Sequence, residues 1–173
     1  MPRTDQTPPP RRRWRRWAFE LTLILLIVAG VQWWKSWPLA TGAAPSLAGV
    51  TLDGRPFDLA QWQGQPVLVH FWATWCPVCQ VMGGTINGIA KDYPVIGVAL
   101  QSGTRVALQD AMRAAGHTFP VLSDPEGAMA SRWGVQGVPS TFVIDPAGHI
   151  RFATVGVSTG PGLRLRLWAA GLQ

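Results

Sequence analysis

The sequence predicts an α/β domain with a mixed β-sheet and helices on both faces, preceded by a single transmembrane helix. Two strongly apolar runs at 67–72 and 95–100 are typical of buried strands, and a helical stretch at 77–91 separates them. A hairpin signal, Asp53-Gly54, lies ahead of them. An apolar run near the N-terminus follows a cluster of arginines, which indicates a membrane segment.

The first residues are interpreted from composition. Residues 1–16 are rich in proline and arginine and are predicted to be disordered. Residues 17–37 are predicted to form the anchor, because about 18 mostly apolar residues just span a bilayer as a helix. Tryptophans bound the run, as at membrane interfaces, and arginines on one side predict an inner-membrane protein with a cytoplasmic N-terminus and its folded domain in the periplasm.

Two alternatives to an anchor remain open for this segment. The uninterrupted apolar run, Leu21 to Val31, is short enough for a cleaved signal peptide, and a buried helix of a soluble protein is the third interpretation. Residues 38–48 lack charge and periodicity and are predicted to be a linker. Residues 49–173 are predicted to form the globular domain.

The elements of this domain follow one another in a β-hairpin, β-α-β-α-β-α and β-β-α order. The helix at 77–91 contains three glycines, each of which weakens a helix by about 1 kcal/mol relative to alanine. The glycines either permit close packing of the backbone or mark local mobility. After the hairpin at 50–59, further elements are predicted at 67–72 (strand), 77–91 (helix), 95–100 (strand), 105–115 (helix), 119–122 (strand), 126–133 (helix), 141–145 (strand), 150–155 (strand) and 162–172 (helix).

The charge distribution argues against a nucleic-acid partner. The net charge is +6, but six arginines precede residue 17, and basic and acidic residues nearly balance from residue 38 onward. Binding to phosphates needs a basic patch on the folded domain. The domain has none in its sequence, so no nucleic acid is expected.

The chain has only two cysteines, Cys76 and Cys79, at the predicted junction between a strand and a helix. A helix N-terminus favours the thiolate, which is the form that attacks disulfides. A disulfide at this spacing closes a very short loop and adds little stability, so its use is chemical. A structural zinc site would need a second pair of ligands. Cu(I) binding by the two thiolates is the alternative function.

Two motifs carry a resemblance to a known family. Residues 71–79, Phe-Trp-Ala-Thr-Trp-Cys-Pro-Val-Cys, and 137–145, Gly-Val-Pro-Ser-Thr-Phe-Val-Ile-Asp, resemble the signatures of thioredoxin-like, membrane-anchored oxidoreductases of the TlpA/ResA/CcmG type. The resemblance covers about residues 46–170. The Pro77-Val78 dipeptide, residues 97–102 and residues 163–168 are most similar to the ScsD (suppressor of copper sensitivity) branch.

The resemblance implies a protein disulfide oxidoreductase with a redox-active Cys76–Cys79 disulfide and no organic cofactor or metal. Its partners would be protein thiols and disulfides and a transmembrane electron donor, which favours a reductase. Cys76 would attack, Cys79 would resolve the mixed disulfide, and Pro139 would be a cis-proline beside the disulfide. The implied substrate-binding residues are Trp75, Pro77, Val138 and Pro139.

The sequence departs from the family at two acidic positions. His70 stands where thioredoxins carry a buried carboxylate, and Ser102 stands near the place of a glutamate in ResA-like proteins. We expect His70 to accept the Cys79 proton as a catalytic residue, because imidazole titrates near neutral pH; the alternative is a residue that only packs. His117 and His149 lie in turn contexts and are expected to be solvated.

Overall fold

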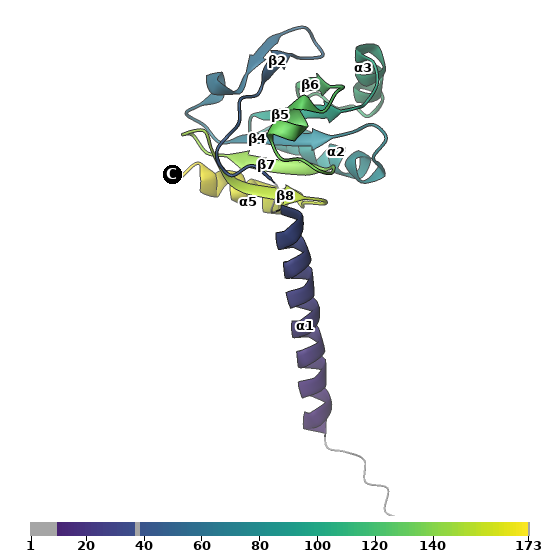
Figure 1. Cartoon of the computed structure of the whole chain (residues 1–173), viewed down its shortest axis with the longest axis vertical. Coiled ribbons are helices and arrows are strands. Elements are labelled where there is room, and N and C mark those ends of the chain that lie inside the picture. Colours follow the sequence, from purple (N-terminus) through teal and green to yellow (C-terminus); the bar gives the residue numbers. More distant parts are fainter. Residues whose placement is uncertain (1–9, 37–38, 173) are drawn as a thin grey trace, which may run out of the picture. The chain divides into compact units, whose positions relative to one another are not determined.

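The computed structural model describes residues 10–36 and 39–172, and the chain divides into two units, 1–37 and 38–173. The first unit contains helix α1 (Pro10–Ser36) (Figure 1). Residues 10–16, which were predicted to be disordered, lie within this helix, whereas residues 1–9 lie outside the described part. No helix in the described ranges combines the length and apolarity needed to cross a membrane. The anchor predicted at 17–37 consequently finds no support in the structure.

The second unit is the α/β domain that the sequence predicts. A small antiparallel hairpin stands at its start, as expected from the Asp53-Gly54 turn. The elements in chain order are β1 (Gly42–Ala43), β2 (Ala48–Val50), β3 (Pro56–Asp58), the 3-10 helix η1 (Leu59–Trp62), β4 (Val67–Trp72), α2 (Pro77–Ile89), β5 (Val95–Leu100), α3 (Arg105–Ala114), β6 (Val121–Asp124), α4 (Ala128–Arg132), β7 (Ser140–Ile144), β8 (His149–Val155) and α5 (Gly160–Ala170).

The main sheet is mixed and has the strand order β1-β8-β7-β4-β5-β6. Strand β4 lies in its centre, parallel to β5 and antiparallel to β7. All six residues of β4 are buried, which explains the continuous apolar run in the sequence. The register places His70 opposite Thr141 and Phe71 opposite Ser140. The carboxyl end of β4 therefore leads directly to the cysteine motif.

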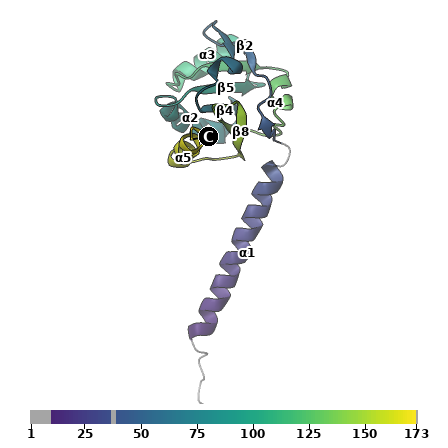
Figure 2. The ribbon, with the colours of Figure 1, turned by 90° about the vertical axis from the view of Figure 1, so that its left-hand side faces the viewer.

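The sheet separates two apolar cores, because side chains along a strand point alternately to opposite faces. Leu68 and Trp72 of β4 face the core that α2, α3 and α5 cover. Val69 and Phe71 face the other core, which contains Trp133 after α4. Figure 2 shows α2 and α5 on one side of the strands and α4 on the other. His70 lies at an even position of β4, so it faces the same side as α2.

The segment predicted as a linker over 38–48 is part of the domain from residue 39 onward. Strand β1 pairs with β8, with Gly42 opposite Ile150. Leu39 and Leu47 are 4% and 0% exposed within the second core, and the Leu47 carbonyl accepts a hydrogen bond from the Leu59 N–H. The linker prediction is wrong because two isolated leucines anchor the segment without producing any periodic pattern.

Element boundaries differ from the predictions by a few residues for local reasons. Strand β6 begins only after Pro120, which has no N–H to give to a strand ladder. Helix α4 begins after Gly127, whose φ of 76° is left-handed. The carboxylate of Asp124 accepts hydrogen bonds from the N–H groups of Met129 and Ala130, which stabilises the start of this short helix.

Candidate active site

The two cysteines occupy the first turn of α2, directly after β4. Cys76 is the N-cap residue of the helix, and Pro77 follows at a position where a missing N–H costs nothing. The Cys79 N–H donates a hydrogen bond to the Cys76 sulfur at 3.2 Å. A sulfur at this position receives the unpaired N–H groups and the positive end of the helix dipole. The sequence prediction of the cysteine motif at a strand-to-helix junction is confirmed.

The two thiols differ in their surroundings. Both are free, and their exposed fractions are 6% for Cys76 and 2% for Cys79. Burial, together with the Cys76 thiol, raises the pKa of the Cys79 thiol well above its ordinary value. Cys79 is therefore protonated across the neutral pH range and must lose a proton before its sulfur attacks.

The Val138–Pro139 peptide bond is cis, as the resemblance implies. The Cys76 thiol donates to the Val138 carbonyl oxygen at 3.7 Å, across 62 residues of sequence. Pro139 is buried, and its carbonyl accepts a hydrogen bond from the Gly156 N–H at 2.8 Å. The loop before β7 is thereby held against the cysteine turn, so the structure brings Cys76 and Val138 together; their catalytic and binding roles stay predictions.

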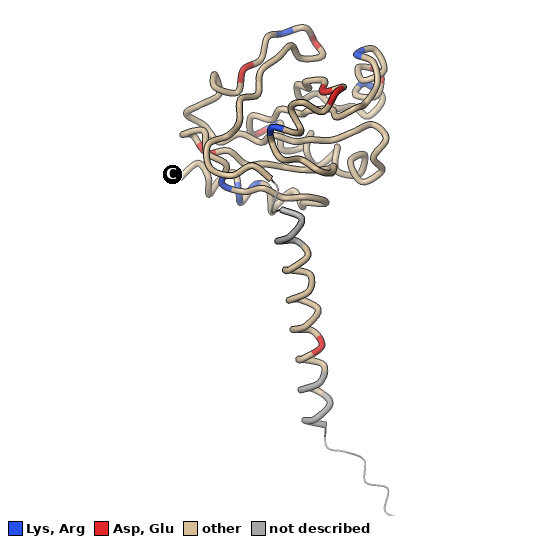
Figure 3. Tube along the Cα trace, in the orientation of Figure 1, with Lys and Arg blue, Asp and Glu red and all other residues tan. Residues whose placement is uncertain are grey.

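Exposed apolar side chains surround the Cys76 turn. Trp75 is 58% exposed, and its indole N–H donates to the Gln101 carbonyl at 3.1 Å. Val78 and Val81 on α2 are also exposed, and α2 contains no charged residue (Figure 3). We call Trp75, Val78 and Val81 the apolar rim. Pro77 is exposed between them, which places two of the predicted substrate-binding residues, Trp75 and Pro77, at the surface beside Cys76.

Ser102 has a structural part in this turn. Its hydroxyl accepts a hydrogen bond from the Thr74 N–H at 3.0 Å and donates to the Leu100 carbonyl at 2.9 Å. The Gln80 side chain also donates to the Thr74 carbonyl. Ser102 thus ties the loop before Cys76 to the end of β5.

His70 is near Cys79 but does not titrate near neutral pH. Both residues line one cavity, and the His70 ring is 1% exposed, with Nδ1 at 3.0 Å from the Thr141 hydroxyl. Burial, with a smaller effect of His117, lowers the pKa of His70 to about 3. This lowered pKa argues against a proton acceptor titrating near pH 6.5, because the protein interior disfavours the imidazolium; the catalytic role of His70 stays a prediction.

His117 was expected to be a solvated turn residue, and the structure places it at the active site instead. It lines the same cavity as Cys79 and His70 and is half-buried. Its ring stacks on Phe119, with centroids 5.6 Å apart. No local sequence pattern marks this position, because the contact joins the end of α3 to helix α2. His149, by contrast, is exposed as expected.

The fold and the paired thiols define the class of thioredoxin-like thiol–disulfide oxidoreductases. The chain belongs to the AhpC/TSA family, whose model matches residues 41–153. It is 36% identical over 121 residues to a thioredoxin-like protein of Haemophilus influenzae, covering 69% of this chain and 72% of that protein. It is 32% identical over 154 residues to the thiol:disulfide interchange protein DsbE of Tatumella citrea, covering 79% and 82%.

Solved structures agree with these relatives. A secreted disulfide oxidoreductase of Mycobacterium tuberculosis, described as homologous to E. coli DsbE, superposes with a TM-score of 0.61 at 26% identity. The match covers 71% of this chain and 95% of that structure. The chain is accordingly a thiol–disulfide oxidoreductase.

Proposed function

We propose that this protein reduces protein disulfides outside the cytoplasm, with Cys76 as the attacking thiol and Cys79 as the resolving thiol. The observation that carries the assignment is the asymmetry of the pair. The Cys76 sulfur accepts a hydrogen bond from the first turn of α2 and is the more exposed of the two. The Cys79 thiol is buried and has a raised pKa. An attacking sulfur must reach the substrate, whereas a resolving sulfur needs to reach only Cys76.

The reaction consists of two exchanges. The Cys76 thiolate attacks one sulfur of a substrate disulfide, a bond forms between them, and the other substrate sulfur leaves as a thiolate. Cys79 then loses its proton and attacks the Cys76 sulfur, and the second substrate sulfur leaves. The substrate disulfide is reduced by two electrons, and the Cys76–Cys79 pair is oxidised to a disulfide.

The reducing direction is supported by the charges around the thiols. A strongly oxidising pair needs a reduced form whose thiolate is stabilised. Helix α2 carries no charge, and the described residues that line the cavity beside Cys79 include neither lysine nor arginine. The thiolate therefore receives help from the helix terminus but not from a neighbouring cation. Location outside the cytoplasm is supported by the DsbE relatives and the secreted oxidoreductase, and such a reductase needs a transmembrane electron donor.

A redox titration of the full-length protein against glutathione tests the direction. We expect a potential close to the value of about −270 mV known for thioredoxin. A potential near the value of about −120 mV that is typical of the oxidant DsbA would contradict the proposal.

Trapping tests the two roles. Cys79→Ala should accumulate mixed disulfides through Cys76, because no second thiol is left to release the substrate. Cys76→Ala is the matched control and should accumulate none. If the control traps partners and Cys79→Ala does not, the roles are reversed.

A further inference from the structure

The resolving thiol lines a cavity, partly bordered by exposed residues, that has a second neighbour able to take a proton. The cavity has a volume of about 310 Å³ and lies between α2, β4 and the end of α3. Its lining is mainly apolar, with Cys79, His70 and His117 among the exceptions. Cys79 is only 2% exposed, and this cavity is a space beside its thiol into which the proton can move.

The His117 ring is held against α2 one helical turn beyond Cys79. A Cβ atom placed on Gly83 would stand 2.2 Å from the Cε1 atom and 2.6 Å from the Nε2 atom of the ring. Gly83 follows Cys79 by four residues, so both lie on the same face of the helix. The absence of a side chain at Gly83 therefore admits the imidazole to the cavity, where Phe119 supports its other side.

The cavity is large enough to hold water between Cys79 and His117. Each water occupies about 30 Å³, so a volume of about 310 Å³ has room for several waters. The polar side chains of His70, Thr74 and Gln80 also line it and can bind such waters.

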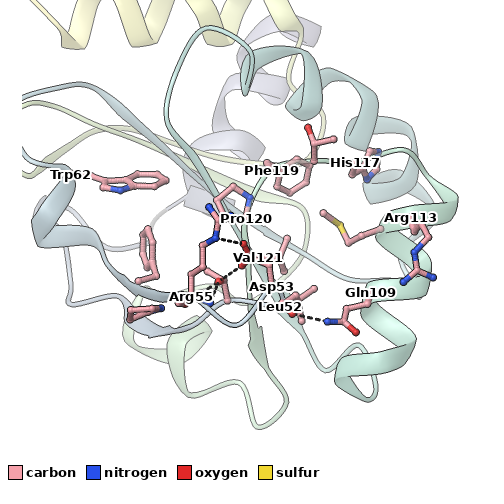
Figure 4. A pocket seen from close by; sticks show the side chains of 15 residues that line it. Leu52, Asp53, Arg55, Trp62, Gln109, Arg113, His117, Phe119, Pro120 and Val121 are labelled. Atoms are coloured by element: carbon pink, nitrogen blue, oxygen red, sulfur yellow. Dashed lines mark hydrogen bonds and ion pairs between the residues drawn. The ribbon is translucent and has the colours of Figure 1, made fainter.

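The other side of His117 borders an open pocket. This pocket has a volume of about 620 Å³ and is lined by the hairpin, α3 and the start of β6. Figure 4 shows His117 and Phe119 side by side at one end of it, with Arg113 nearby. His117 and Phe119 line both the open pocket and the inner cavity. The imidazole thus borders both the cavity that the resolving thiol lines and the open pocket.

We propose that His117 is the base that receives the Cys79 proton, through water in the inner cavity, and passes it to solvent through the open pocket. The proposal rests on the proposed role of Cys79 as the resolving thiol. When Cys79 attacks the mixed disulfide, its proton moves through water to the neutral imidazole as the sulfur–sulfur bond forms. The substrate sulfur leaves with the electron pair of the broken bond, and the imidazolium then releases the proton outward.

The electrostatics of the site favour His117 over His70. Burial lowers the pKa of His117, so the ring is neutral and able to accept a proton at neutral pH. His70 is a much weaker base, with a pKa of about 3, and its Nδ1 is occupied by Thr141. The ionisable groups that face His117 across the two cavities are Cys79 on α2, His70 on β4, Arg113 on α3, and Asp53 and Arg55 on the hairpin. Arg113 pairs with Asp110, and Asp53 with Arg55.

The test separates the two exchanges with a small aromatic disulfide, dithiobis(nitrobenzoate). Reduced full-length protein releases one nitrothiobenzoate when Cys76 attacks and a second when Cys79 resolves, and stopped-flow absorbance follows both. In the wild type, the second rate should be flat at high pH and fall as pH drops through the lowered pKa of His117. In His117→Ala it should be about 100-fold slower at pH 7 and rise about tenfold per pH unit, as for attack by hydroxide.

Further variants distinguish a proton carrier from a packing residue. In His117→Ala, the rate of the first nitrothiobenzoate release should be unchanged, and free imidazole should restore the rate of the second release. Gly83→Ala, which displaces the ring, should reproduce the slow second release, whereas Gly84→Ala and His149→Gln should match the wild type. An unchanged pH profile in His117→Ala, or an equal loss in both releases at every pH, would overturn the inference.

Two single-cysteine controls separate this inference from the proposed function. Cys79→Ala should release its one nitrothiobenzoate at the fast first rate of the wild type, whereas Cys76→Ala should release its one equivalent far more slowly. If they do so while His117→Ala behaves as the wild type, only the role of His117 is refuted. If Cys76→Ala reacts at the fast rate and Cys79→Ala does not, the assignment of Cys79 itself fails.

Discussion

Replacing Gly83 with alanine has two opposite effects on stability: alanine favours the helix, but its Cβ atom collides with the packed His117 ring. In an exposed helix position, Gly→Ala stabilises a protein by about 1 kcal/mol. At Gly83 the new Cβ would lie 2.2 Å from a carbon of the His117 ring, well inside van der Waals contact. Forcing an extra carbon into a packed site costs about 1–3 kcal/mol. The ring is at the end of a side chain, but its stacking on Phe119 resists displacement. We expect a net loss of about 0–2 kcal/mol.

The neighbouring glycines provide matched controls on the same helix. A Cβ on Gly84 or on Gly88 meets no atom within 4 Å, so each substitution should raise the free energy of unfolding by up to about 1 kcal/mol. Urea denaturation of the reduced full-length protein measures all three variants. The expected difference between Gly83→Ala and Gly84→Ala is about 1–3 kcal/mol. Equal stabilisation by the two substitutions would refute close packing of His117 on α2.

Two further perturbations follow from the site. Because the pKa of His70 is lowered to about 3 by burial, the unfolded chain binds a proton at higher pH than the folded one. The contribution of His70 to the free energy of unfolding is thus complete above about pH 6.5 and falls by up to about 1.4 kcal/mol per pH unit below that pH. His70→Gln should make the free energy of unfolding, measured by urea titration, less dependent on pH in this range. An unchanged dependence on pH would contradict the lowered pKa. Trp75→Ala should raise KM severalfold for a protein disulfide but not for dithiobis(nitrobenzoate), because Trp75 is exposed at the apolar rim; equal effects on both substrates would argue against a docking role.

The sequence was sufficient to predict the order of the domain's elements because apolar periodicity and turn residues are local signals. Strands β4 and β5 were predicted with their observed bounds, since buried parallel strands have continuous apolar runs. Residues 39–48 were missed because their packing depends on single side chains, Leu39 and Leu47, meeting a core formed by distant segments. A strand of two residues such as β1 has no periodicity to detect.

The active site was predictable to the extent that its residues are adjacent in sequence or belong to a known motif. The cysteine pair and the Val138–Pro139 bond fall in this group. The state of His70 was not predictable, because its lowered pKa results from complete burial against Thr141 on a neighbouring strand. His117 carries no signal at all in the sequence, since its position depends on the space left by Gly83, 34 residues earlier in the numbering.

Because Cys79 is buried, its proton needs a path to a base that also borders solvent, and a nearby base alone is not enough. The interior that shields the Cys79 thiol from solvent also raises the pKa of this thiol and lowers that of His70, because a low-dielectric surrounding disfavours every charged form. A buried thiol and a buried imidazole thus resist exchanging a proton with each other. A half-buried imidazole such as His117, which also borders an open pocket, does not suffer this penalty to the same degree. The glycine that admits the ring to α2 is therefore as important to this route as the histidine itself.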